Sequence, residues 1–182
     1  MDPENIILIS FGYFEKRLLD MITRDVSLGF MLPVTTREGF LDLSEFFDPT
    51  RKQYNGTLLL KKIESEFSSG SSKTIAIFNI DLFIPILTYI FGQAYLNGNS
   101  GIVSVYRLSN ERYGIGKDDE IIVDRFRKEV IHELGHMFGL IHCYDSDCVM
   151  RSSTYVEDID QKSHNLCVKC KSQLVTHGIS AR

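Results

Sequence analysis

The stretch that decides the fold and the chemistry of this chain runs from residue 132 to residue 142 and reads HELGHMFGLIH. His132 and His136 are one helical turn apart, so on a helix they share a face, with about 5–6 Å between their Cβ atoms. Two imidazoles placed in this way can both reach one zinc ion at about 2.0–2.1 Å. Gly139 lets the chain turn after the helix, because glycine adopts positive φ at little cost, and His142 can then return as a third nitrogen ligand.

The residue after the first histidine, Glu133, is placed to act on a water molecule rather than on the metal. Three protein ligands leave one coordination position open, which is typical of a catalytic zinc. In such a site Glu133 is the general base when water attacks a carbonyl, and it returns the proton to the leaving amine. The alternative is a charged helix surface without metal, and the extension of the motif to Gly139 and His142 argues against it.

A helix predicted over residues 118–140 carries the motif. Asp118 or Asp119 can cap it, and apolar residues recur at every fourth position along it. His132 and His136 lie two positions away from this stripe, so they point roughly opposite to it. We therefore expect one face of the helix to be buried against a sheet and the other to present its histidines to a cleft. The apolar stripe consists of Ile122, Phe126, Val130, Leu134 and Phe138.

The rest of the chain predicts an α/β fold, with a mixed twisted sheet backed by helices. Apolar runs predict strands at residues 5–10, 28–34, 74–79 and 102–108, and helical spacing predicts helices at 13–22 and 58–67. Residues 39–55 are interpreted as loop or short helix. The 182 residues fit one compact domain. Within it we expect an N-terminal catalytic subdomain, residues 1–142, and a C-terminal subdomain, residues 143–182.

Charge and hydropathy exclude several classes of partner. The net charge of −4 does not favour nucleic acid or an anionic membrane. The acidic start of the chain lacks the basic region of a secretory signal, and the longest apolar run, residues 82–91, is too short to span a bilayer. We expect a cytoplasmic, monomeric protein that binds neither nucleic acid nor membrane.

All four cysteines lie between residues 143 and 170, and none precedes them. Such clustering in a reducing compartment favours a metal site, and the four thiolates could hold a structural zinc in tetrahedral geometry. The alternatives are two disulfides or free thiols. Because Cys143 directly follows His142, we also expect the cysteine cluster to position the third histidine. The cluster consists of Cys143, Cys148, Cys167 and Cys170.

The histidine motif, continued by this cysteine pattern and by Met150, resembles the signature of the archaemetzincin family of metzincin zinc metalloproteases. The resemblance runs from Asp81 to Cys170 and is looser over the first eighty residues. It implies a metzincin-like fold, a structural zinc beside the catalytic one, and Met150 as the methionine that packs beneath the zinc ligands. Some metzincins carry a tyrosine two residues after this methionine, whereas this chain has Ser152.

The edge strand that borders the cleft in metzincins is expected at five consecutive residues, which could hold an extended peptide through main-chain hydrogen bonds. A buried strand without substrate contact is the alternative. Outside the motif, His164 and His177 are interpreted as surface histidines, and Tyr155 is not expected to be a site residue. The expected strand consists of Phe91, Gly92, Gln93, Ala94 and Tyr95.

The function predicted from these patterns is that of a zinc metallopeptidase acting on a peptide or protein, with one catalytic and one structural zinc. The sequence leaves open whether it is an endopeptidase or an aminopeptidase. Two other functions remain: a zinc-bearing module that binds peptides with little turnover, and a zinc hydrolase of non-peptide amides. The intact Glu133 argues against the binding module, which would need no base.

Overall fold

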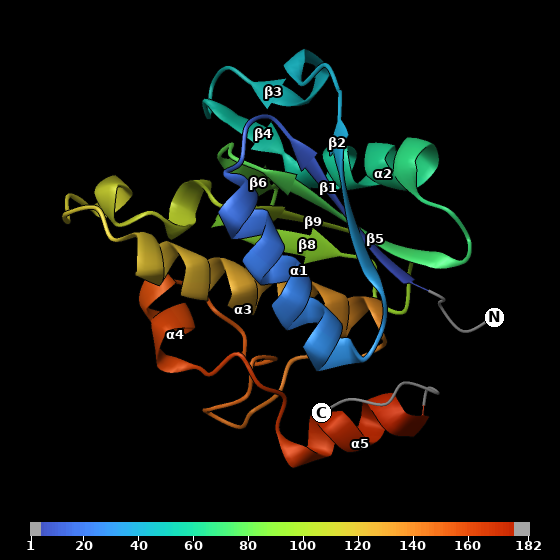
Figure 1. Ribbon diagram of the computed structural model, residues 1–182. Coiled ribbons are helices and arrows are strands. Elements are labelled where there is room, and N and C mark those ends of the chain that lie inside the picture. The colour runs from blue at the N-terminus through green and yellow to red at the C-terminus, as the bar shows by residue number, and fades with distance from the viewer. Residues whose placement is uncertain (1–4, 177–182) are drawn as a thin grey trace.

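A five-stranded sheet with strand order β2-β1-β5-β9-β8 forms the centre of the computed structural model, which describes residues 5–176, with side chains through residue 174 (Figure 1). Neighbouring strands pair in parallel, except that β8 runs antiparallel to β9. Among the described residues β8 has no partner strand on its outer side, so it is an edge strand. The strands are β1 (Asn5–Phe11), β2 (Val34–Gly39), β5 (Ser72–Phe78), β8 (Gly92–Ala94) and β9 (Ser100–Ser104).

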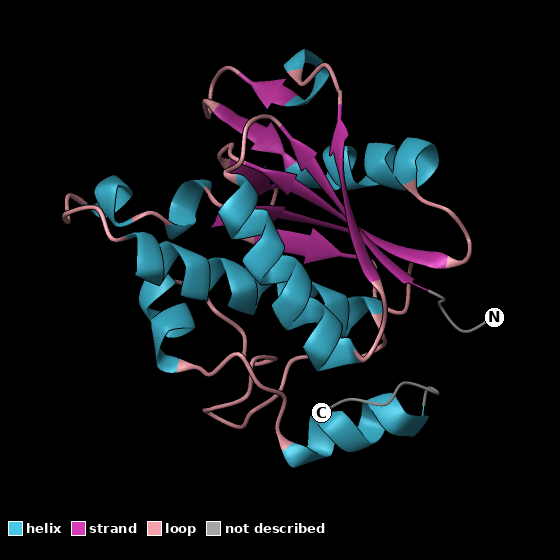
Figure 2. Cartoon of the chain, viewed as in Figure 1, coloured by secondary structure: helices cyan, strands magenta, loops and turns pink. Residues whose placement is uncertain are grey.

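Helices cover both faces of this sheet (Figure 2). Helices α1 (Lys16–Phe30) and α3 (Asp119–Met137) pack on one face, and α2 (Gly56–Phe67) packs on the other. Side chains of β5 alternate between the two apolar cores: Ile75 and Ile77 join the first, whereas Ala76 and Phe78 join the second. This alternation is the two-residue period of a strand that is buried on both faces.

A smaller four-stranded sheet of order β3-β4-β6-β7 adjoins the second core. Its last strand leads through Phe91 directly into the edge strand β8. The remaining short elements are 3-10 helices at Ser44–Phe46, Tyr106–Leu108 and Asn110–Tyr113. The strands of this sheet are β3 (Phe47–Asp48), β4 (Gln53–Asn55), β6 (Leu82–Ile84) and β7 (Leu87–Ile90).

Helix α3 is the central helix of the fold. The side chain of Asp118 accepts hydrogen bonds from the backbone N–H groups of Glu120 and Ile121, at 3.0 and 3.1 Å, which confirms the predicted cap. Phe126, Val130 and Leu134 of the apolar stripe are fully buried. The helix is also buried on its polar side, because the C-terminal segment covers it there.

The segment after His142 contains two helices, α4 (Val156–Gln161) and α5 (Val168–Thr176), and no strand among its described residues. Both helices lie beside α3 on the side away from the sheet (Figure 1). The division into subdomains at residues 142 and 143 stays a prediction. In the part of the chain that the structure describes, no helix has the length and apolar character needed to cross a membrane.

The α/β fold and most of its elements match the expectations, with four main differences. Residues 39–55, interpreted as loop or short helix, contain the strands β3 and β4 besides a 3-10 helix. The strand predicted at 28–34 is wrong, because α1 continues to Phe30 and Met31 ends it in the left-handed region at φ 54°. That helix starts at Lys16, not at residue 13, and runs eight residues past the predicted end, residue 22. The strand predicted at 102–108 ends at Ser104, where the chain turns into a 3-10 helix.

Candidate active site

The three motif histidines converge at the C-terminal end of α3. The Nε2 atoms of His132 and His136 lie 3.1 Å apart, and the ring of His142 lies 5.3 Å and 4.9 Å from theirs, between centroids. The Nδ1 atom of His132 lies 2.8 Å from the carbonyl oxygen of Val149, and that of His136 lies 2.8 Å from the carbonyl oxygen of Leu140. A carbonyl can only accept, so each Nδ1 carries the proton.

This arrangement fits a bound metal ion. With both Nδ1 atoms protonated, the facing Nε2 atoms of His132 and His136 each present a lone pair, and two lone pairs at 3.1 Å repel unless a cation lies between them. In a tetrahedral site with Zn–N distances of about 2.0–2.1 Å, two ligand nitrogens lie about 3.3 Å apart. Burial lowers the pKa of each of the three histidines, most strongly that of His132, which favours the neutral form that binds metal.

The turn that returns His142 to the helix depends on Gly139, whose φ of 87° lies in the left-handed region. The N–H of Gly139 donates to the carbonyl of His136, and the N–H of Leu140 donates to that of Gly135, both at 2.9 Å. These bonds close the helix end in the manner of a glycine C-cap. Beneath this turn lies Met150, which is fully buried, and a Cβ on Gly135 would overlap its Sδ atom.

The side chain of Glu133 is buried beside the histidines, and its Oε2 atom has no hydrogen-bond partner among the described residues. Burial raises the pKa of Glu133 well above its usual value; Glu129 raises it further, and Lys162 lowers it. The carboxylate lies against Gly92 of β8, where a Cβ would be 2.7 Å from Oε1. The glycine therefore provides the space that this glutamate occupies.

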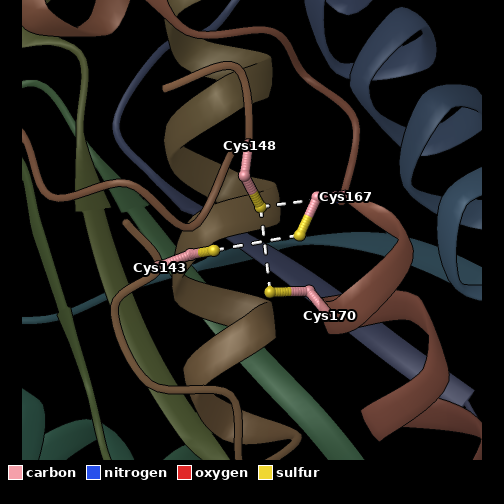
Figure 3. A group of neighbouring side chains, drawn as sticks. All are labelled: Cys143, Cys148, Cys167 and Cys170. Carbon is pink, nitrogen blue, oxygen red and sulfur yellow. Dashed lines mark hydrogen bonds between the residues drawn. The ribbon is translucent and has the colours of Figure 1, made fainter. Parts of the chain in front are cut away.

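The four cysteines form a separate cluster between the active-site turn and α5 (Figure 3). The Sγ atoms of Cys143 and Cys167 are 3.8 Å apart, as are those of Cys148 and Cys170, so all four are free thiols and not disulfides, whose S–S distance is about 2.0 Å. Tetrahedral zinc with Zn–S bonds of about 2.3 Å separates its sulfurs by about 3.8 Å. Burial raises the pKa of Cys148 and Cys170, so a cation is needed to hold them as thiolates.

The histidines and Glu133 lie at the bottom of a cleft of about 420 Å³. Residues 87–94 form one wall, and residues 152–155, which follow Met150, form the other. The phenol of Tyr89 joins the two walls, because its hydroxyl donates to the carbonyl oxygen of Thr154 at 3.1 Å. Helix α3 forms the floor, and the cleft therefore lies between the edge strand and the C-terminal segment.

A comparison with known protein families agrees with this geometry. Residues 17–176 match the model of peptidase family M54. Archaemetzincin of Thermococcus kodakarensis is 32% identical over 176 residues, which cover 93% of this chain and 95% of that protein. The chain belongs to the archaemetzincin family. Archaemetzincin of Haloquadratum walsbyi is 44% identical over 131 residues, covering 70% of this chain and 75% of that protein.

Solved structures of similar proteins have the same fold. The crystal structure of archaemetzincin from Methanopyrus kandleri matches with a TM-score of 0.83 and 30% identity over 96% of this chain and 95% of that one. The crystal structure of a zinc-dependent peptidase from Methanocorpusculum labreanum matches with a TM-score of 0.80 and 29% identity over 93% of this chain and 100% of that one. The chain is accordingly a zinc metallopeptidase, and its histidine and cysteine groups have the donor sets that zinc prefers.

The structure places most of the residues predicted for the archaemetzincin site in or beside the cleft. Four residues of the expected edge strand, Phe91 to Ala94, line it, whereas Tyr95 is outside the lining and packs on the second core. Ser152 and the exposed Tyr155 also line the cleft. His164 is half-buried in another hollow, away from the histidine group, and His177 lies outside the described residues.

Two charged residues of the cleft were missed from the sequence, Glu129 and Lys162. The only sequence signal for Glu129 is its position one helical turn before Glu133, which places both on the same face of α3. Lys162 is distant in sequence and reaches the cleft because it follows α4. No local pattern marks such a residue.

Proposed function

We propose that the chain hydrolyses peptide bonds in this cleft, with His132, His136 and His142 holding a catalytic zinc and Glu133 acting as general base. One observation carries the proposal: the Nε2 atoms of two histidines face each other at 3.1 Å while backbone carbonyls hold both Nδ1 atoms. Neutral imidazoles oriented in this way by hydrogen bonds on the far nitrogen are typical of metal ligands.

A zinc ion held there would polarise the substrate carbonyl and acidify a water molecule. The protein supplies the proton transfer. Glu133 is buried next to the histidines with one carboxylate oxygen free of hydrogen bonds, and its raised pKa makes it a stronger base than an exposed glutamate. The same residue can carry the proton to the leaving amine. The outer edge of β8 offers main-chain hydrogen bonds to an extended peptide next to Glu133.

We further propose a second, structural zinc on Cys143, Cys148, Cys167 and Cys170, which would organise a C-terminal subdomain beginning at residue 143. Its support is the spacing of the four sulfur atoms. Metal analysis of the purified chain should find two zinc ions, and Cys167→Ser together with Cys170→Ser should remove at least one. A content of one zinc in the unaltered chain would contradict the second site.

That the chain is a monomer located in the cytoplasm was predicted from the sequence and stays a prediction.

The test of the peptidase is cleavage of a diverse peptide library by the zinc-loaded chain, with mass spectrometry to place the cuts. The variant Glu133→Gln keeps the shape of the side chain and removes the base, and Glu157→Gln makes the same change at an exposed glutamate of α4. We expect Glu133→Gln to lower the rate by at least about 10²-fold and Glu157→Gln to leave it unchanged.

The cut positions separate the remaining possibilities. Internal cuts identify an endopeptidase, and loss of single N-terminal residues identifies an aminopeptidase. If zinc is bound but no peptide is cleaved, the peptidase proposal is wrong, and the same preparation can be assayed for peptide binding and for hydrolysis of non-peptide amides.

A further inference from the structure

The floor of the cleft continues beyond the histidines toward the N-terminal end of α3, where it carries an ion pair that the proposed reaction does not use. Glu129 lies one helical turn before Glu133, and Lys162 follows α4; both line the cleft. The Nζ atom of Lys162 lies 3.2 Å from Oε1 of Glu129. This pair is next to the reacting groups and within reach of a substrate side chain.

The two charges of this pair are not equally accessible. The side chain of Lys162 is 0% exposed and that of Glu129 is 5% exposed, so Glu129 is the member of the pair that keeps some surface in the cleft. Lys162 also donates to the carbonyl of Arg151 at 3.2 Å. Although Oε1 of Glu129 is within ion-pair distance of the ammonium, it accepts no well-directed hydrogen bond and is shielded from solvent. Glu129 therefore has unused acceptor capacity.

Neighbouring contacts hold the pair in place. Arg125 donates to both carboxylate oxygens of Asp160 at 2.7 Å, and Lys128 donates to the carbonyl of Ile159 at 3.1 Å. Both bonds fasten α4 to α3, two or three residues before Lys162. These contacts hold the backbone that carries Lys162, and its buried ammonium keeps Glu129 paired in the wall of a preformed cleft.

We infer that Glu129 determines specificity by accepting a hydrogen bond from a basic substrate side chain that flanks the scissile bond. An apolar side chain placed over Glu129 would cover the remaining exposed surface of this side chain and supply no donor to the carboxylate. A lysine or arginine side chain would supply a charge-assisted hydrogen bond, and glutamine would supply a weaker neutral one. The inference rests on the proposed peptidase function.

The test compares kcat/KM of the zinc-loaded full chain on peptides that differ only at the two positions flanking the cut. At one of these positions we expect lysine or arginine to exceed leucine by about tenfold or more, with glutamine between them. Glu129→Gln should abolish most of this preference, and any loss of rate that it causes through the pKa of Glu133 should be equal for lysine and leucine peptides. The matched control, Glu157→Gln, should keep the full preference.

A second variant tests the inference without leaving an unpaired buried charge that could unfold the chain. Glu129→Met combined with Lys162→Met removes both charges, leaves no uncompensated ion, and should reverse the preference toward leucine. A wild-type preference for apolar residues at both positions would overturn the inference. So would a preference for lysine that survives in Glu129→Gln, since Glu129 would then act only on Glu133 and not on the substrate.

Binding separates this inference from the peptidase proposal. Calorimetry on the zinc-loaded Glu133→Ala chain measures affinity for uncleaved lysine and leucine peptides. Tighter binding of the lysine peptide that disappears when Glu129→Gln is added supports the inference even if the wild type cleaves nothing. Equal affinity for the two peptides contradicts it even if the wild type is an active peptidase.

Discussion

The ring of His132 donates a 2.8 Å hydrogen bond from Nδ1 to the carbonyl oxygen of Val149, the residue that lies between Cys148 and Met150. A second link runs through His142, because this residue directly precedes Cys143. The N–H of Cys143 donates to the carbonyl of Met150 at 2.9 Å. Two of the three histidines are therefore tied to backbone that the cysteine cluster holds. The proposed structural and catalytic metal sites share one short segment of chain.

We therefore predict that loss of the cysteine cluster weakens the catalytic site. Cys167 and Cys170 lie far from the histidines in sequence, so Cys167→Ser with Cys170→Ser changes the histidine site only through this segment. We expect the affinity of the histidine site for zinc to fall by about 10–100-fold, the size of effect seen when groups that orient metal ligands are lost. Titration against a chelator of known affinity measures it.

The control for this experiment is Lys169→Ser, an exposed change on α5 between the two cysteines. Circular dichroism must show that the double variant keeps its helices, since unfolding would also release zinc. If the double variant is folded and its histidine site binds zinc with unchanged affinity, the two sites are not coupled.

A second prediction concerns the space beside Glu133. In Gly92→Ala the new Cβ would lie 2.7 Å from Oε1 of Glu133, 2.8 Å from its Cγ and 2.8 Å from the carbonyl oxygen of Ile102. Because the backbone carbonyl cannot give way easily, the glutamate must move. A displacement of about 1 Å in a catalytic group can cost about 10²-fold in rate. We expect such a loss of kcat with the zinc content unchanged.

Gly70→Ala is the matched control, since a Cβ there meets no atom within 4 Å. Full activity of Gly92→Ala would show that Glu133 does not need its present position. Loss of zinc from Gly92→Ala would show instead that the strain spreads to the histidines.

The sequence predicted best those features that local patterns encode. Helix α3 was predictable because a capping aspartate, Asp118, and an apolar residue at every fourth position lie within one stretch of chain. The edge strand at residues 92–94 was expected only through the resemblance to metzincins. The strand expected at 28–34 failed because Phe30 continues the four-residue spacing of the buried Ile22 and Val26, which belongs to a helix that packs on the sheet.

Some residues of the candidate site could likewise be predicted from local spacing, whereas others could not. The three histidines and Glu133 lie within eleven residues, so helical geometry alone brings them together. Glu129 and Lys162 meet only because Arg125 and Lys128 fasten α4 to α3, which is a tertiary contact between segments about thirty residues apart. No period or spacing in the sequence encodes it.

A third prediction concerns the bridge between the cleft walls. Tyr89→Phe removes the hydroxyl that donates to Thr154 and leaves the ring, which packs at 4.3 Å from the guanidinium of Arg107. The bond is exposed, so we expect the free energy of unfolding to fall by only about 0.5–1.5 kcal/mol. With the walls no longer joined, kcat/KM should rise for peptides with bulky residues and stay constant for small ones. An equal change for both would show that the bridge does not limit access.

A fourth prediction follows from Asp158, which orders the other wall of the cleft. Its Oδ2 atom accepts hydrogen bonds from the N–H groups of Thr154 and Tyr155, at 2.9 and 2.8 Å. These backbone bonds lower the pKa of Asp158 below its usual value of 3.8, and the bond from Tyr155 has the largest effect. Asp158→Ala removes a cap of the kind that stabilises a helix start by about 1 kcal/mol at neutral pH.

The sign of the pH effect is fixed by the direction of this shift. Because the pKa is lower in the folded chain, the unfolded chain binds more protons near pH 4, and stability rises with pH there. The contribution of Asp158 is fully present above pH 3.8 and is lost as the pH falls through the folded pKa. Denaturant unfolding of wild type and Asp158→Ala should therefore differ at pH 7 and converge as the pH falls below the folded pKa of Asp158. Asp20→Ala, at an exposed residue of α1, serves as control, and a wild-type advantage that persists in acid would contradict the role of the ionised carboxylate.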